Sequence, residues 1–141
     1  DIVERSGRDI SVVSEMLDLR NRQLAQVTHA DDFIVSNHLV SLMLTQIAEN
    51  RDLLPVFTDL FDADGSELYL KAARDYVELD RPLSFYTVVE AARRRGQVAI
   101  GYRRSALADD AAAQYGVRVN PRKSESISFA GGDRIIVVAE D

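Results

Sequence analysis

The chain has 141 residues, of which 46% are hydrophobic and 28% charged, with a net charge of -6 and no cysteine. This length suits one ordinary domain or two small lobes with a real core, and the composition is globular rather than disordered. The acidic balance argues against a nucleic-acid or anionic-membrane surface as the main partner, and the lack of cysteine excludes disulfide scaffolds, thiolate metal sites and cysteine nucleophiles.

The charge is unevenly distributed along the chain. Residues 1–85 have 8 basic and 16 acidic side chains, residues 86–123 have 8 basic and 3 acidic, and residues 124–141 have 1 basic and 4 acidic. An acidic first half and a later basic patch suggest lobes or subunits that attract one another. No apolar stretch approaches the ~20 residues of a membrane span, and no signal peptide is visible. The chain is expected to be soluble, intracellular and, since it does not begin with Met, a piece of a larger protein.

The first half alternates between strands and helices. A β-branched run predicts a strand at 10–13 that ends near Ser14 and Glu15, an amphipathic helix is expected at 19–27, and 33–35 predicts a second strand. This alternation indicates an open parallel sheet. Since such sheets bind ligands at the carboxyl ends of their strands, Glu15 and Asp18 are candidate ligands for a metal ion; a helix cap or loop solvation is the alternative for both.

Two apolar helices follow this sheet. The first begins at Ser36 or Asn37 and is apolar around most of its circumference, whereas a surface helix has only one apolar stripe. The second covers 53–61, with Pro55 tolerated in its first turn. A small chain can hardly wrap such a hairpin alone, so we expect it to form a subunit or lobe contact. The candidate interface residues are Leu39, Val40, Met43, Leu44, Ile47 and Phe57.

The second half predicts a smaller α+β lobe. Residues 66–79 are expected to be extended, and a clear helix at 85–95 is predicted between a Ser84 cap and Gly96. Residues 104–116 are either loop or short helix.

Three strands complete the predicted lobe. The first, at 97–103, should place Val98, Ile100 and Tyr102 on one face. The segment 116–122 predicts a brief strand that Pro121 stops, and a β-branched run predicts the closing strand at 134–139. The last follows a tight turn at Gly131 and Gly132, where glycine reaches positive φ at no steric cost, and it is expected to be buried.

Several familiar sites are absent or unsupported. The chain has no G-x-S-x-G, G-x-G-x-x-G or G-x-x-x-x-G-K motif, and the "DADGSE" segment fails the EF-hand register because Leu60 and Lys71 stand where carboxylates are needed. His29 and His38 have no partners at zinc-ligand spacing. The arginines 93–95 would bind an anion or, more simply, interact with the helix dipole.

The chain nevertheless resembles the cytosolic part of the CASTOR/POLLUX family of ion channels, whose members have domains of the RCK type (regulator of potassium conductance) akin to TrkA subunits. The resemblance covers nearly the whole chain and is most specific in "VSEMLDLRN", "VSNHLVS" and "IGYRR". The terminal "GGDRIIVVAED" is similar to the end of TrkA C-terminal lobes.

This resemblance implies a fold and a mode of action. Residues 1–63 would be the later half of a Rossmann-like RCK lobe with the crossover helix hairpin, and residues 64–141 an RCK or TrkA-C-like C-terminal lobe. Such domains form a homo-oligomeric gating ring at the cytoplasmic face of a membrane, beneath a transmembrane pore of the same chain. Ca²⁺ or a nucleotide would bind the full-length protein; Glu15 matches the first position of a family Glu-x-Glu calcium motif, and Leu17 occupies the second.

Three functions stay open at this point. The first is a non-enzymatic regulatory region of a CASTOR/POLLUX-like cation channel that senses a ligand. The second is a soluble nucleotide-binding subunit of a potassium uptake system, which a full-length gene without a pore would favour. The third, a substrate lobe of a Rossmann-type enzyme, lacks any positioned acid, base or nucleophile in this chain.

Overall fold

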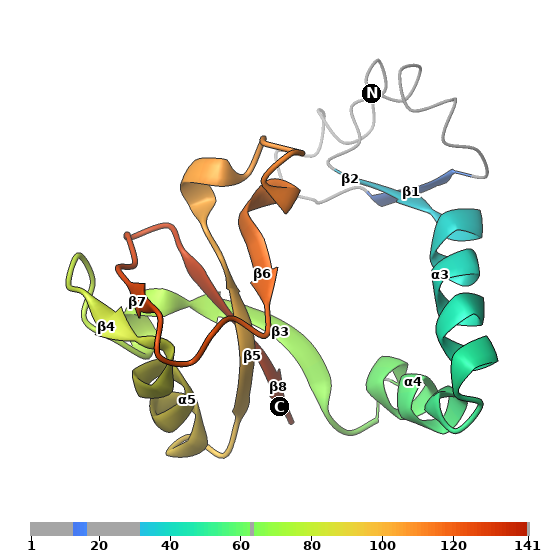
Figure 1. Cartoon of the computed structure of the whole chain (residues 1–141), viewed down its shortest axis with the longest axis horizontal. Coiled ribbons are helices and arrows are strands. Elements are labelled where there is room, and N and C mark those ends of the chain that lie inside the picture. The colour runs from blue at the N-terminus through green and yellow to red at the C-terminus, as the bar shows by residue number, and fades with distance from the viewer. Residues whose placement is uncertain (1–12, 17–31, 63, 141) are drawn as a thin grey trace, which may run out of the picture. The chain divides into compact units, whose positions relative to one another are not determined.

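The computed structural model describes residues 13–16, 32–62 and 64–140, which form a mixed α/β protein (Figure 1). The chain divides into two compact units between Leu54 and Pro55. The boundary expected at residues 63 and 64 stays a prediction.

The first unit contains a pair of parallel strands. Strand β1 (Val13–Met16) pairs with β2 (Asp32–Val35), so that Glu15 lies opposite Ile34. The parallel pairing agrees with the expected alternation. The sequence pattern placed the end of the first strand at Ser14 and Glu15, whereas β1 continues to Met16. The helix expected at 19–27 lies outside the described residues.

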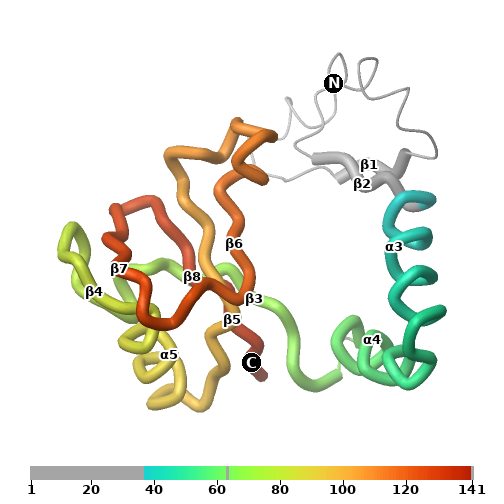
Figure 2. Tube along the Cα trace, viewed as in Figure 1, coloured from blue at the N-terminus to red at the C-terminus, as the bar shows by residue number. Residues whose placement is uncertain are grey.

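Helix α3 (Ser36–Glu49) follows β2 without a loop, and helix α4 (Leu53–Phe61) follows after three residues. Both agree with the predicted ranges. Between them, the Asn50 carbonyl accepts from the Leu53 amide and its side-chain oxygen accepts from the Asp52 amide, an Asx turn that ends one helix and starts the next. Pro55 stands in the first turn of α4, where its missing N–H has no carbonyl to bond. Figure 2 follows this path from α3 through α4 into the next strand.

The second unit is built on a four-stranded antiparallel sheet in the order β3-β8-β5-β6. Its strands are β3 (Glu67–Ala72), β5 (Val98–Arg103), β6 (Val117–Val119) and β8 (Arg134–Ala139). A short ribbon of β4 (Leu83–Ser84) and β7 (Ser126–Ile127), which the sequence pattern missed, accompanies the sheet. The segment expected to be extended at 66–79 is a strand only to Ala72 and then turns into a 3-10 helix at Ala73–Asp75.

The core lies on one face of this sheet, under helix α5 (Phe85–Arg93). Phe85, Val88 and Ala92 of α5 are fully buried, since positions three and four apart fall on one side of a helix. The Tyr102 ring packs edge-on against Phe129, with 5.6 Å between the ring centroids. Gly96 has a φ of +71° and ends the helix as predicted. The predicted Ser84 cap is wrong in its chemistry, because the residue holds the cap position but its side chain makes no capping hydrogen bond.

The prediction that Val98, Ile100 and Tyr102 share one face of β5 is wrong, because the strand contains a bulge. The pairing of β5 with β8 shifts between Ala99 and Gly101, so the alternation of faces is interrupted there. Val98 is therefore 62% exposed while Tyr102 is only 5% exposed, and the two do not share a face. The closing strand β8 is likewise buried on one face only, with Ile135, Val137 and Ala139 inside.

The glycine turn before β8 also differs from the expectation. Neither Gly131 nor Gly132 has a positive φ. Gly132 is required for another reason, since a Cβ there would lie 2.7 Å from the Ser105 hydroxyl oxygen. The turn brings Asp133, which is 1% exposed, against the loop after β5.

Asp133 joins two loops through its carboxylate. Oδ1 accepts from the backbone N–H of Ser105 at 2.9 Å and from its hydroxyl at 3.1 Å, and Oδ2 accepts from the Ala130 amide at 2.9 Å. Arg104 Nε lies 3.4 Å from Oδ2. The polar residue before the final strand is thus a buried structural link, which explains why an acid stands directly beside a run of Ile and Val.

Candidate oligomer interface

Helix α3 has an apolar surface that the described residues of its own unit leave uncovered. At about 100° per residue, its Leu, Val, Met and Ile side chains follow one another around more than half of the helix. Leu39, Val40 and Leu44 are exposed, Leu44 by 60%, and Met43 and Ile47 are half-buried. Five of the six residues predicted for an interface therefore lie on this apolar surface of α3, and the sixth, Phe57, is on α4.

The opposite side of α3 is polar, and two of its hydroxyl groups donate hydrogen bonds to carbonyls of the same helix. The Ser41 hydroxyl donates to the Asn37 carbonyl at 2.8 Å, and the Thr45 hydroxyl donates to the Ser41 carbonyl at 2.9 Å. These bonds to the carbonyl four residues back keep the hydroxyls engaged on the helix itself. His38 is exposed on this helix, and His29 lies outside the described residues. The polarity of this side distinguishes it from the candidate contact surface.

Helix α4, most of which belongs to the second unit, also has exposed apolar side chains. None of its residues is buried. Leu54, Val56 and Phe61 are exposed, Phe61 by 65%, and the rings of Phe57 and Phe61 stack at a centroid distance of 6.4 Å. A nine-residue helix without a buried side chain gains little from its own fold, so its apolar surface is suited to a contact with another body.

Of the two candidate metal ligands, only Glu15 lies within the described residues. Glu15 lies one residue before the end of β1, and Asp18 falls outside the described residues. Within the described segments, no three His, Asp or Glu side chains come together in a way that could hold a metal ion. The assignment of Glu15 and Asp18 stays a prediction.

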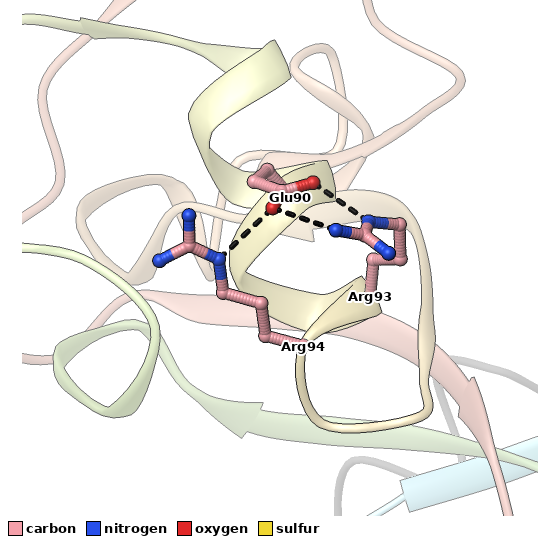
Figure 3. A network of polar contacts seen from close by, with 3 residues as sticks. All are labelled: Glu90, Arg93 and Arg94. Carbon is pink, nitrogen blue, oxygen red and sulfur yellow. Dashed lines mark hydrogen bonds and ion pairs between the residues drawn. The ribbon is translucent and has the colours of Figure 1, made fainter.

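The arginines at the end of α5 are each engaged in local contacts. Glu90 accepts from Arg93 Nε at 2.8 Å and from Arg94 Nε at 2.9 Å (Figure 3). These hydrogen bonds lower the pKa of Glu90 to about 2. The Arg95 guanidinium lies 5.0 Å from the centre of the Tyr76 ring and donates to the Asp75 carbonyl. This arrangement favours the structural interpretation of the three arginines over an anion site.

A surface hollow of about 550 Å³ lies beside β6 and was not anticipated from the sequence. Its lining includes Arg104 and Arg118, which are already paired with Asp133 and Glu125. Both arginines are thus already neutralised by a carboxylate. It adds no binding residue to the candidate surface on α3 and α4.

No helix in the described part of the chain has the length and apolarity needed to span a membrane. The chain matches no protein-family model. It is 35% identical over 130 residues to the probable ion channel POLLUX of Oryza sativa subsp. japonica, which covers 92% of this chain and 13% of the relative. Ion channel CASTOR of Lotus japonicus is 33% identical over 129 residues, covering 92% of this chain and 14% of the relative.

Ion channel DMI1 of Medicago truncatula is 37% identical over 92 residues, or 65% of this chain and 10% of that protein. The chain thus spans only about a seventh of the length of the first two relatives. These two alignments nevertheless cover 92% of this chain. The chain therefore belongs to the CASTOR/POLLUX family of ion channels and corresponds to one segment of its much longer members.

Proposed function

We propose that this chain is part of the cytosolic regulatory region of a CASTOR/POLLUX-like cation channel. In this proposal the protein associates with further copies through α3 and α4, senses a ligand and transmits its occupancy to a transmembrane pore of the same polypeptide. The relatives support it because they are named ion channels. Their naming as channels is also consistent with a role that is not enzymatic.

The observation that carries the proposal is the uncovered apolar surface of α3. Fully burying a side chain such as Leu, Ile or Met contributes roughly 1.5–3 kcal/mol, so leaving several of them in water forgoes a large stabilisation. A helix of this kind is stable and soluble when another body covers it. In a homo-oligomer that body is a second copy, which makes the helix part of an interface rather than of a private core.

The proposed architecture follows the same lines. Residues 1–63 form the later half of a Rossmann-like RCK lobe with a crossover helix pair, and residues 64–141 form a TrkA-C-like lobe. The parallel pairing of β1 and β2 with a helix directly after β2 is consistent with an open α/β sheet, and the antiparallel sheet with one covering helix is consistent with a separate small lobe.

Ligand sensing would work as a population shift. A ligand that prefers one arrangement of the associated copies stabilises that arrangement by its difference in affinity between the two states, and the attached pore follows. Glu15 and Asp18 are the residues we propose for a cation, Ca²⁺ being the first to test, and a nucleotide is the alternative ligand of the full-length protein. The region would lie at the cytoplasmic face of the membrane.

Electrical recording of the full-length channel tests this function. Met43→Asp and Ile47→Asp introduce a charge into the apolar surface of α3, where association would bury it without a partner. We expect these variants to lose ligand-dependent opening while Ser41→Asp, on the polar side of the same helix, retains it. Unchanged ligand-dependent opening in both apolar-side variants would refute the role of α3 in gating.

A further inference from the structure

The four-stranded sheet of the second unit has an apolar face opposite its core. Leu68 and Leu70 of β3 pair with Val138 and Ile136 of β8, while Val98 of β5 also pairs with Val138. Leu68, Leu70 and Val98 are exposed, and the two β8 residues are only half-buried. An antiparallel sheet that faces water on one side normally presents polar residues there. We call these five residues the open face.

Two arginines border the open face at one end. Arg103 and Arg134 are direct partners in the pairing of β5 with β8. They lie on the side of the sheet opposite the buried neighbours Tyr102 and Ile135, since side chains alternate along a strand. Among the described residues, neither arginine makes a salt bridge or a side-chain hydrogen bond. Like charges directly across a sheet are destabilising, so this end of the open face is suited to receive acidic groups.

Helix α4 has the complementary chemistry. Its apolar side chains form one stripe, Asp59 lies beside that stripe, Asp62 follows the last turn, and the helix contains no basic residue. None of its side chains is buried. A nine-residue helix is about 13 Å long, and three strands at a spacing of about 4.8 Å span about 10 Å between the outer two. The helix therefore matches the width of β3, β8 and β5.

We propose that the open face binds helix α4 of a second copy of this chain, with the acidic residues of the helix directed to Arg103 and Arg134. The described residues cover neither surface, because Leu68 and Leu70 stay exposed and α4 buries no residue. Docking between copies removes both apolar surfaces from water and neutralises the arginine pair. The inference rests on the proposed oligomer and names the surface that receives α4.

Cysteine cross-linking of the whole chain tests this pairing directly, because the chain has no cysteine of its own. Leu70→Cys is mixed with Val56→Cys, Phe57→Cys or Phe61→Cys, each in a separate preparation, and oxidised. A disulfide needs the two Cα atoms within about 7 Å, so only adjacent sites will join. We expect a cross-linked dimer from at least one mixture, and none when Tyr86→Cys, exposed on α5, replaces Leu70→Cys.

A charge exchange provides the second readout. Arg134→Glu and Asp59→Arg are each expected to weaken self-association at least about threefold, and the chain with both changes should recover most of it. Arg122→Glu, an exposed change away from the open face, is the control. Recovery in the double variant is the result that a merely structural effect of either arginine does not produce.

Three results would overturn the inference. The first is a stable dimer that gives no cross-link in any mixture, which leaves the oligomer intact and removes only the open face as its docking site. The second is a cross-link within a single chain carrying both cysteines, which assigns the open face to its own helix. The third is a chain that remains monomeric throughout, which contradicts the proposed oligomer as well.

Discussion

Removal of the Asp133 carboxylate should lower the free energy of unfolding of the second unit by more than the removal of an exposed carboxylate does. The side chain is 1% exposed and accepts three hydrogen bonds, two from Ser105 and one from Ala130. A hydrogen bond to a charged group contributes about 1.5–3 kcal/mol, and removing one member of a buried charged contact costs about 3–5 kcal/mol in total. We therefore expect Asp133→Ala to lower the free energy of unfolding by about 4 kcal/mol.

Equilibrium unfolding in urea measures this loss. With a slope of about 1–3 kcal/mol per M, a loss of about 4 kcal/mol moves the midpoint by about 1–4 M. Asp133→Asn keeps one carbonyl oxygen and so retains the contacts of either Ser105 or Ala130; its expected loss is about 2–3 kcal/mol. This milder variant preserves the test if Asp133→Ala does not fold.

The control is Asp109→Ala, which removes an exposed carboxylate from the same loop region and should change stability by less than about 0.5 kcal/mol. A loss of less than about 1 kcal/mol in Asp133→Ala would contradict this prediction, because the donors of Ser105 and Ala130 would then not depend on the buried carboxylate.

Three further predictions follow from local contacts. The pKa of Glu90 is about 2 instead of its usual 4.5. The unmodified chain should therefore be more stable than Glu90→Gln by a margin that is full above pH 4.5 and fades as the pH falls toward 2. Unfolding at several pH values measures this margin, and a margin that stays constant with pH would contradict the prediction. Gly132→Ala should lower the melting temperature, because the new Cβ would lie 2.7 Å from the Ser105 hydroxyl oxygen; an unchanged melting temperature would refute this steric argument. Ile135→Ala should cost about 2–5 kcal/mol in urea unfolding and Ile136→Ala clearly less, whereas equal losses would contradict the assignment of the core face.

The helices and the long strands were predictable from the sequence because their signals are local. The α4 range follows from the apolar spacing between 53 and 61, and the β8 range from a β-branched run after a turn. The α5 terminus at Gly96 follows from the one residue type that adopts its positive φ freely.

Features that depend on contacts between distant segments were not predictable. The bulge between Ala99 and Gly101 is set by pairing with β8, so the alternating pattern alone placed Val98 and Tyr102 on one face. The role of Asp133 depends on Ser105, 28 residues earlier in the chain. The two-residue strands β4 and β7 are too short to produce a periodic signal.

One of the candidate contact surfaces was predictable from the sequence, and the other was not. The residues on α3 were identifiable because a helix that is apolar around most of its surface violates the usual single stripe. The open face was missed because Leu68 and Leu70 look like ordinary alternating strand residues until the pairing shows which side the core occupies. A Glu or Lys at these positions would have marked a solvent face, so their apolar character was the available signal.

The proposed function depends on a second copy that covers the apolar surface of α3. The most direct measurement is the solution mass of the chain by sedimentation over a range of concentrations, beside Met43→Asp and the control Ser41→Asp. We expect twice the chain mass of 15.7 kDa, or a higher multiple, for the unmodified chain and for Ser41→Asp, and a shift toward 15.7 kDa for Met43→Asp. A mass of 15.7 kDa for the unmodified chain at every concentration, or an oligomer that Met43→Asp leaves unchanged, would contradict it.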